Sequence, residues 1–240
     1  MPAAAPPGNR LLLISNSTMH GGGYLDHVEG PVREFLPGAV RVLFVPYALG
    51  DRDAYARRAR ARFQAMGLDL DSIHKARSAR DAVERAEAVF VGGGNTFRLL
   101  KTLQEEGLLE PIRRRVESGM PYMGSSAGSI VACPTIRTTN DMPIVEPSTL
   151  SSLALVAFQI NAHYLDPDSA SRHMGETREE RLRQFHEENA SPVVGLREGS
   201  FLSVSGGSVV LEGSAAARIY RRGEDPVEVP PGTTLDELLS

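Results

Sequence analysis

A serine with small neighbours on both sides stands out in the segment GSSAGS, residues 124–129. The segment has the form G-x-S-x-G, with Ser126 between Gly124 and Gly128. In a nucleophile elbow, small flanking residues permit the strained turn that exposes a serine hydroxyl at the start of a helix. The first N–H groups of that helix can hold the oxyanion formed when the hydroxyl attacks a carbonyl. The pattern therefore predicts nucleophilic catalysis by Ser126, with Ala127 as one oxyanion donor; an ordinary Gly/Ser loop is the alternative.

A second glycine cluster, GGGN at residues 92–95, follows the apolar stretch 88–91. Three glycines allow backbone N–H groups to approach a ligand closely. A dinucleotide-binding loop is the competing interpretation. However, GGGNTF lacks the G-x-G-x-x-G spacing, and no acidic residue follows about 20 residues later at the end of a second strand. We expect the N–H of Gly94 to complete an oxyanion hole opposite Ala127.

A nucleophilic serine needs a general base, and the chain contains six histidines. His163, in FQINAHYLDP, follows an apolar run at 153–158 that would place it at the end of a strand. His173, in a polar loop, is the alternative base. His20 lies in the glycine-rich loop SNSTMHGGGYLDH, where a substrate contact or a structural role fits better than a role as base.

The third member of a catalytic triad is a carboxylate that orients the imidazole and stabilises its charged form. Asp141, in RTTNDMPIV, is favoured because it follows an extended stretch that begins with proline and precedes an apolar turn. Asp166, Asp168 and Glu146 are alternatives that the pattern leaves open.

The elements that would position these residues are short apolar runs alternating with amphipathic stretches, which is typical of parallel βα units. In such sheets, ligands bind beyond the carboxyl ends of the strands, where the loops described above would lie. Strands are expected at residues 10–15, 40–46, 88–91 and 121–123. Helices are expected at 24–36, 51–66, 79–85 and 96–118, the last with a break near Gly107.

The pattern changes after Pro134, where a loop-rich segment and a polar helix at 176–188 precede several β patterns. Glu-Gly, Gly-Gly and Glu-Gly-Ser turns separate these patterns and predict antiparallel strands. The expected fold class is α/β, a mostly parallel sheet flanked by helices with antiparallel strands near the C-terminus. We expect residues 1–9 to be disordered and 10–240 to form a single catalytic domain. The β patterns lie at 193–197, 201–204, 208–212 and 216–221.

The composition of the chain limits the cellular compartment, the partners and the cofactors that are expected for it. The 240-residue chain has one cysteine, Cys133, so an internal disulfide is excluded and a reducing cytoplasm is favoured. A net charge of 26 − 30 = −4 argues against nucleic acid as a partner. No apolar stretch approaches the roughly 20 residues needed to span a bilayer. Dispersed histidines and a single cysteine predict no metal site, and no cofactor is expected.

Together the motifs resemble peptidase E, the α-aspartyl dipeptidase family of serine peptidases. The matching segments run in order from SNSTMHGGGYLDH through FVGGGNTFRLL, YMGSSAGSIVACPTIRTTNDMPIV and FQINAHYLD to GETREERL, residues 15–182. The resemblance implies a flavodoxin-like α/β fold similar to that of class I glutamine amidotransferases. One departure is Ser125, which stands where the family commonly has an aromatic residue after the first glycine of the elbow.

Carried over residue by residue, the resemblance implies roles for five residues. Ser126 would be the nucleophile, His163 the general base and later acid, and Asp141 the orienting carboxylate. Gly94 and Ala127 would supply the oxyanion-hole N–H groups.

The resemblance also implies cleavage of dipeptides that begin with aspartate. A buried substrate carboxylate requires a cation, ideally a bidentate guanidinium. Arg178, in GETREE, is the first candidate, and Arg137, in PTIRTTND, is the second. Arg178 also fits a salt-bridged helix face shared with Glu176, Glu179 and Arg181.

Two other functions are compatible with parts of the pattern. A cyanophycinase-like peptidase would share the fold and the elbow but act on a β-aspartyl-arginine polymer, whereas TTNDMP and GETREE favour peptidase E. A non-catalytic, amidotransferase-like binder of small molecules would be marked by loss of the triad, and all three members are present here. The loops after Pro134 and the β-rich end offer surface for a homodimer.

Overall fold

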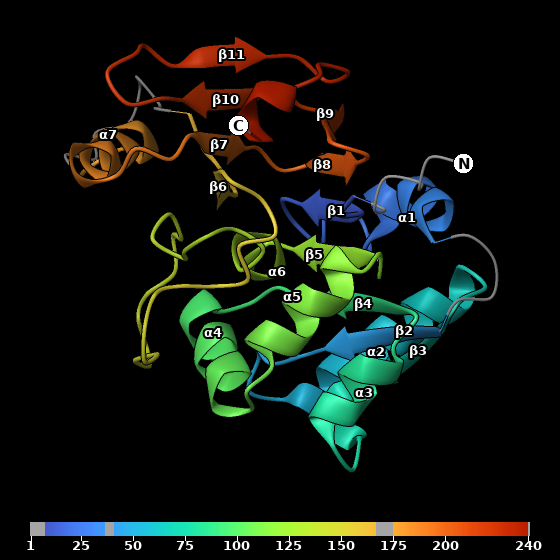
Figure 1. Ribbon diagram of the computed structural model, residues 1–240. Helices are drawn as coiled ribbons and strands as arrows, with labels where there is room; N and C mark the ends of the chain where they lie inside the picture. The colour runs from blue at the N-terminus through green and yellow to red at the C-terminus, as the bar shows by residue number, and fades with distance from the viewer. Residues whose placement is uncertain (1–7, 37–40, 167–174, 240) are drawn as a thin grey trace, which may run out of the picture.

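Parallel strands form the centre of the computed structural model, which describes residues 8–36, 41–166 and 175–239 (Figure 1). The main sheet has seven strands in the order β3-β2-β4-β5-β1-β8-β9. The pairs from β3 to β1 are parallel, and β8 and β9 join the sheet antiparallel. The strands are β1 (Leu11–Ile14), β2 (Arg41–Val45), β3 (Asp69–Ser72), β4 (Ala88–Val91), β5 (Tyr122–Ser125), β8 (Ser200–Ser205) and β9 (Ser208–Gly213).

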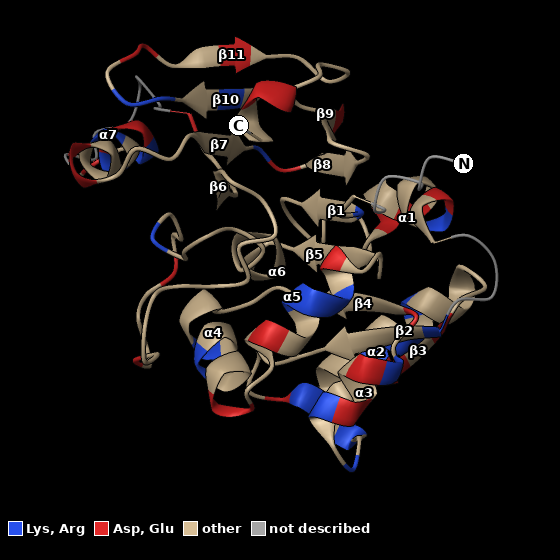
Figure 2. Ribbon diagram, in the orientation of Figure 1, with Lys and Arg blue, Asp and Glu red and all other residues tan. Residues whose placement is uncertain are grey.

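Helices cover both faces of this sheet. Successive residues of a strand point to opposite faces, so each central strand contributes to two hydrophobic clusters. In β1, Leu11 and Leu13 belong to one hydrophobic cluster, and Leu12 and Ile14 belong to another. The first cluster includes residues of α3 (Ala79–Arg85), α4 (Thr96–Glu105) and α5 (Leu109–Glu117), and the second includes residues of α1 (Glu29–Phe35) and α2 (Arg52–Ala65). Figure 2 shows charged residues on these helices, whereas β1, β4 and β5 carry none.

A second sheet of four strands has the order β11-β10-β7-β6, and in Figure 1 it lies above the parallel strands β1, β5 and β4 of the main sheet. Its β6–β7 pair is parallel, and its other pairs are antiparallel. The short helix α6 (Ala127–Ile130) contacts both β5 and β6, so it lies where the two sheets meet. The remaining elements are β6 (Gln159–Ala162), α7 (Arg178–Glu188), β7 (Val193–Leu196), β10 (Ala217–Tyr220), β11 (Val227–Val229), η1 (Asp26–Val28), η2 (Ile73–Lys75) and η3 (Asp236–Leu239).

The predicted α/β class is confirmed. The break expected near Gly107 in the helical stretch 96–118 is also present, since α4 ends at Glu105, α5 begins at Leu109, and Gly107 between them adopts a φ of 62°. The edge strand β3 went unpredicted because its sequence, DLDS, is half exposed and polar. Of the antiparallel strands, β8 and β9 extend the main sheet, whereas β10 and β11 belong to the second sheet.

The N-terminal segment 1–9 was expected to be disordered. Its residues 1–7 lie outside the described residues, and Asn9 donates a side-chain hydrogen bond to the carbonyl of Leu155 at 2.8 Å. Within the described ranges, no helix combines the length and the apolar character needed to cross a membrane.

Candidate active site

Ser126 occupies a sharp turn between β5 and α6. Its φ of 52° and ψ of −111° lie outside the regions that non-glycine residues favour. The backbone holds this strain in place: the N–H of Ser126 donates to the carbonyl of Ile14 at 2.9 Å, and the hydroxyl of Tyr122 donates to the carbonyl of Gly128 at 2.6 Å. The serine is partly exposed at the carboxyl end of a parallel strand. This is the geometry of a nucleophile elbow.

The glycines of the elbow are required by close backbone contacts. A Cβ on Gly128 would lie 2.0 Å from the carbonyl oxygen of Val91, and a Cβ on Gly124 would lie 2.5 Å from the carbonyl oxygen of Gly128. Neither neighbour is a side chain that can rotate away, so β4, β5 and α6 would have to separate.

We therefore expect Gly128→Ala to destabilise the fold by about 3 kcal/mol or more, measured by urea denaturation. The matched control is Gly30→Ala, because Gly30 lies in a helix with nothing within 4 Å of the added Cβ. Alanine has the higher helix propensity, so this control should be neutral or stabilising. Equal unfolding midpoints for Gly128→Ala and wild type would refute this explanation of the motif.

His163 follows β6 and reaches the serine. Its Nε2 lies 3.0 Å from Oγ of Ser126. Its backbone has a φ of 53°, and its N–H donates to Oγ of Ser15 at 3.0 Å. The hydroxyl of Ser15 in turn donates to the carbonyl of Leu196 at 2.7 Å. The fully buried Ser15 thus joins the end of β1 to β6 and β7 and fixes the histidine beside Ser126.

The carboxylate that meets the imidazole belongs to Glu198, whose Oε1 lies 2.7 Å from Nδ1 of His163. With Nδ1–H donating to Glu198, Nε2 is left to accept the hydroxyl proton of Ser126. Glu198 lies in the turn between β7 and β8, and the next residue, Gly199, has a φ of 83°. The N–H of Gly199 donates to Oδ1 of Asn16 at 2.8 Å, which holds the turn against the end of β1.

The expected contact between Asp141 and His163 is not formed. Oδ2 of Asp141 accepts hydrogen bonds from the N–H of Thr96 at 2.7 Å and from its hydroxyl at 2.5 Å. The side chain of Asn95 also donates to the carbonyl of Met142 at 2.9 Å. A carboxylate is stabilised at the N-terminus of a helix by N–H groups that lack intrahelical partners. Asp141 therefore anchors its loop to the start of α4, next to the GGGN segment.

Two of the alternative acids, Asp166 and Glu146, lie in the described part of the chain. Asp166 pairs with Arg197, and the carbonyl of Glu146 accepts from Lys101 at 3.5 Å. His173 and Asp168 lie outside the described residues. Glu198 was not among the acids predicted from the sequence, because the Glu-Gly pair at 198–199 was interpreted only as a turn. The available signal was that a strand pattern ends just before it, and carboxyl ends of strands were already the expected location of functional residues.

Of the two expected oxyanion donors, Ala127 directly follows the serine, and Gly94 follows Gly93 in the loop after β4. Gly94 has a φ of 133°, and a Cβ there would lie 2.8 Å from the carbonyl oxygen of Ala48. The neighbouring Gly93 is the residue of this loop in contact with the elbow, since its Cβ would lie 3.0 Å from Cβ of Ser126. In the described part of the chain, the N–H groups of Gly94 and Ala127 donate to no protein acceptor. Both are therefore available to a substrate oxygen.

Arg178, the first candidate for the substrate carboxylate, is the first residue of α7 and is partly buried. Burial lowers the pKa of its guanidinium, and the like charge of Arg181 acts in the same direction. The salt-bridged helix face is present, with Arg181 3.7 Å from Glu176 and Arg183 2.8 Å from Glu179. Arg178 forms no ion pair with the described residues, so that face does not account for it.

The other two expected substrate contacts are exposed. Within the described part of the chain, Arg137 makes no side-chain hydrogen bond or ion pair, and its backbone N–H donates to Oγ1 of Thr135 at 3.4 Å. His20 lies in the loop whose Met19 packs on the turn of Glu198, since a Cβ on Gly199 would lie 3.2 Å from Cε of Met19. The loop of His20 is thus adjacent to the turn of Glu198.

A cysteine thiol also lies close to the elbow in the sequence. Cys133 is buried, and burial raises the pKa of its thiol, which disfavours the nucleophilic thiolate. Across residues 8–36, 41–166 and 175–239, no group of three or more histidine, cysteine, aspartate or glutamate side chains is arranged to hold a metal ion.

A strained serine bonded to a histidine, which is bonded in turn to a carboxylate, defines a hydrolase site of the serine type on this α/β sheet. The sequence model of the family described as peptidase family S51 matches residues 11–212. The chain belongs to peptidase family S51, and the family resemblance expected from its motifs is confirmed.

Relatives cover nearly the whole chain. Peptidase E of Streptomyces coelicolor is 55% identical over 95% of this chain and 94% of its own length. A probable alpha-aspartyl dipeptidase of Drosophila melanogaster is 46% identical over 95% of this chain and 97% of its own. Among solved structures, a peptidase from an acI-B1 Actinobacterium has a TM-score of 0.72 at 16% identity, covering 96% of this chain and 97% of its own. A putative peptidase E from Listeria monocytogenes has a TM-score of 0.65 at 21% identity, covering 86% and 99%. These structures support the fold.

Proposed function

We propose that this protein is a serine dipeptidase that hydrolyses dipeptides with an amino-terminal aspartate, and that Ser126, His163 and Glu198 form its catalytic triad. The observation that carries the proposal is the imidazole of His163, which lies 3.0 Å from the Ser126 hydroxyl and 2.7 Å from the Glu198 carboxylate. The names of the relatives, which are 41–55% identical, support the choice of substrate.

Acylation begins when Oγ of Ser126 attacks the carbonyl carbon of the aspartyl residue. Nε2 of His163 accepts the hydroxyl proton, and Glu198 stabilises the resulting imidazolium. The negative charge on the former carbonyl oxygen is held by the N–H groups of Gly94 and Ala127. The collapse of this tetrahedral intermediate breaks the peptide bond.

The imidazolium of His163 then protonates the leaving amine, and the second residue of the dipeptide departs. An aspartyl ester on Ser126 remains. Nε2 of His163 next takes a proton from a water molecule that attacks this ester. Breakdown of the second tetrahedral intermediate releases aspartate, and His163 returns the proton to the serine.

Arg178 is proposed to bind the side-chain carboxylate of the substrate, since it is partly buried and its described surroundings offer it no carboxylate. We expect Arg178→Met to lower kcat/KM for Asp-Leu about 10- to 100-fold, the size of a lost charge-assisted hydrogen bond. The ratio of kcat/KM for Asp-Leu to that for Asn-Leu should fall with it.

Arg181→Met is the matched control, because Arg181 lies on the same helix but faces Glu176. It should keep the wild-type ratio of Asp-Leu to Asn-Leu hydrolysis. If Arg178→Met also keeps that ratio, Arg178 does not bind the aspartyl side chain, and Arg137→Met becomes the variant to measure.

The proposed substrate class is tested by assaying Asp-Leu, Glu-Leu, β-Asp-Arg and longer peptides that begin with aspartate. Asp-Leu should be the preferred substrate. Preferential cleavage of β-Asp-Arg would favour the cyanophycinase-like alternative, and binding without turnover of any peptide would favour a non-catalytic binder. The cytoplasmic location and the homodimer stay predictions from sequence.

A further inference from the structure

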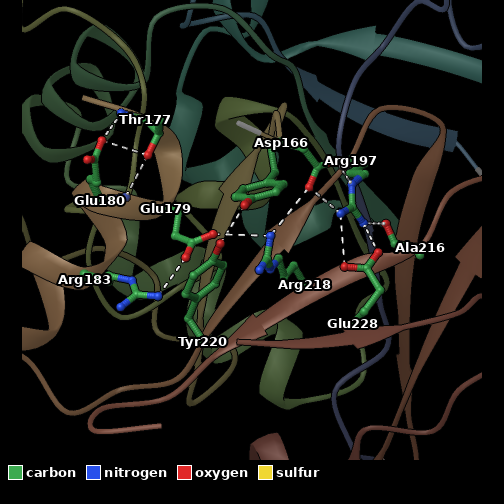
Figure 3. Close-up of polar contacts among 11 residues, drawn as sticks. Asp166, Thr177, Glu179, Glu180, Arg183, Arg197, Ala216, Arg218, Tyr220 and Glu228 are labelled. Atoms are coloured by element: carbon green, nitrogen blue, oxygen red, sulfur yellow. Dashed lines mark hydrogen bonds and ion pairs between the residues drawn. The ribbon is translucent and has the colours of Figure 1, made fainter. Parts of the chain in front are cut away.

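Arg197, the residue before Glu198, uses all five N–H donors of its guanidinium (Figure 3). Its Nε and Nη2 donate to the two carboxylate oxygens of Asp166 at 2.8 and 2.7 Å. Its Nη1 and Nη2 donate to the carboxylate of Glu228 at 2.5 and 3.1 Å, and Nη1 also donates to the carbonyl of Ala216 at 2.8 Å. The side chain of Arg197 is only 18% exposed. Two bidentate pairs on one guanidinium leave it little freedom to move.

These contacts join the two chain segments that carry the imidazole and the carboxylate. Arg197 immediately precedes Glu198, and Asp166 lies three residues after His163. Between them, the N–H of Tyr164 donates to the carbonyl of Leu196 at 3.1 Å, and the guanidinium of Arg197 lies 5.5 Å from the centre of the Tyr164 ring. The ion pair of Arg197 and Asp166 therefore links the segment that follows β7 to the segment that follows β6.

The imidazole and carboxylate need such support because both are open to solvent. The side chains of His163 and Glu198 are 43% and 47% exposed. An ion pair or hydrogen bond at that exposure contributes little to holding its own geometry. Ser15 and Asn16 hold the two segments on the side of β1, and Arg197 with Asp166 holds them on the side of the second sheet.

The same cluster extends to α7. Arg218 on β10 lies 3.9 Å from Asp166 and 3.3 Å from Glu179, which also pairs with Arg183 (Figure 3). Arg197 lowers the pKa of Asp166, so the carboxylate remains charged at neutral pH.

We propose that Arg197 and Asp166 are positioning residues, which keep the Glu198 carboxylate aligned with Nδ1 of His163 and thereby maintain the proton transfer from Ser126. This inference rests on the proposed function for its kinetic consequence. Misalignment of reacting groups by about 1 Å costs up to about 100-fold in rate. Loosening the pair should therefore lower kcat and leave KM nearly unchanged, since neither residue touches the proposed binding groups.

The test compares Asp166→Asn and Arg197→Met with Glu228→Gln. We expect the first two to lower kcat for Asp-Leu about 10- to 100-fold with KM within about twofold of wild type. Glu228 contacts the same guanidinium, but it lies on β11 and reaches no residue of the triad. Its variant should keep kcat within about twofold of wild type, because the contact between Arg197 and Asp166 persists.

A second readout is independent of catalysis. Long-range ¹H–¹⁵N spectra of protein labelled in its six histidines report the tautomer of each ring, and His163→Gln assigns the signal of His163. Wild type and Glu228→Gln should show the tautomer protonated at Nδ1, and Asp166→Asn should show a mixture. If Arg197→Met fails to fold, the isosteric Asp166→Asn decides.

Asp166→Asn with wild-type kcat and an unchanged His163 tautomer would overturn the inference. An equal loss of kcat in Glu228→Gln would also overturn it, because the cluster would then act only as general structure. If wild type itself fails to cleave Asp-Leu, the proposed function is wrong, and the tautomer comparison still tests the positioning role.

Discussion

Alanine in place of Ser126 is expected to lower kcat for Asp-Leu by about 10⁶-fold, the size of the loss when a serine nucleophile is removed from a triad. The hydroxyl oxygen that lies 3.0 Å from Nε2 of His163 would be gone. The variant should fold, since alanine keeps the Cβ and so adds no strain at a φ of 52°. Product release measured by chromatography and a thermal unfolding curve check both parts.

Ser125→Ala is the control for this substitution. The hydroxyl of Ser125 is buried, and it has no hydrogen-bond partner among the described residues. Removing an unpaired buried hydroxyl should leave activity near wild type and should not lower stability. The assignment of the nucleophile would fail if Ser126→Ala kept substantial activity or if Ser125→Ala abolished it.

Glutamine in place of Glu198 is the second large effect. An amide cannot stabilise the imidazolium of His163 as a carboxylate does, and losing that acid in a buried triad costs about 10⁴-fold. Since His163 and Glu198 are 43% and 47% exposed, water can replace part of the interaction. We expect a loss in kcat of about 10²- to 10³-fold with little change in KM.

Asp141→Asn separates the two candidate carboxylates. An asparagine oxygen can still accept from the N–H of Thr96, so the start of α4 should lose about 1 kcal/mol or less of stability and kcat should fall less than about tenfold. Parallel kinetics and urea denaturation of the two variants measure this contrast. A greater loss of kcat in Asp141→Asn than in Glu198→Gln would return the orienting role to Asp141.

Residues that follow a single recognisable strand were predictable. Ser126 and Gly94 each lie within three residues of a short apolar run, and small neighbours mark the backbone that they need. His163 was predictable from the apolar run that precedes it, although its strand, β6, is only Gln159–Ala162. In each case the relevant information is local, because the elbow, the glycine loop and the strand end are properties of a few consecutive residues.

The remaining parts of the site depend on which strands become neighbours. Glu198 reaches His163 because β6 and β7 pair in parallel, with Ala162 opposite Leu196. Ser15 meets His163 across 148 residues of sequence, a contact that no local pattern contains.

Asp141 was assigned the wrong partner for the same reason. Its polar setting suggested a carboxylate that could bind a histidine, but it accepts a hydrogen bond from the N-terminus of α4, 45 residues earlier in the sequence. A local pattern identifies an acid that needs a partner without identifying the partner. Only the packing of the loop on α4 decides between a helix cap and a triad member.

The most direct test of the account is covalent labelling with a diphenyl phosphonate analogue of aspartate. Oγ of the serine bonds to its phosphorus and phenol is released, which leaves a tetrahedral adduct resembling the transition state. Peptide mapping by mass spectrometry should locate one adduct per chain on Ser126, with activity on Asp-Leu lost in proportion to labelling. Inactivation with the adduct on Ser125 or on any other residue, or full labelling of Ser126 with activity retained, would contradict the assignment of Ser126 as the nucleophile of an aspartyl dipeptidase.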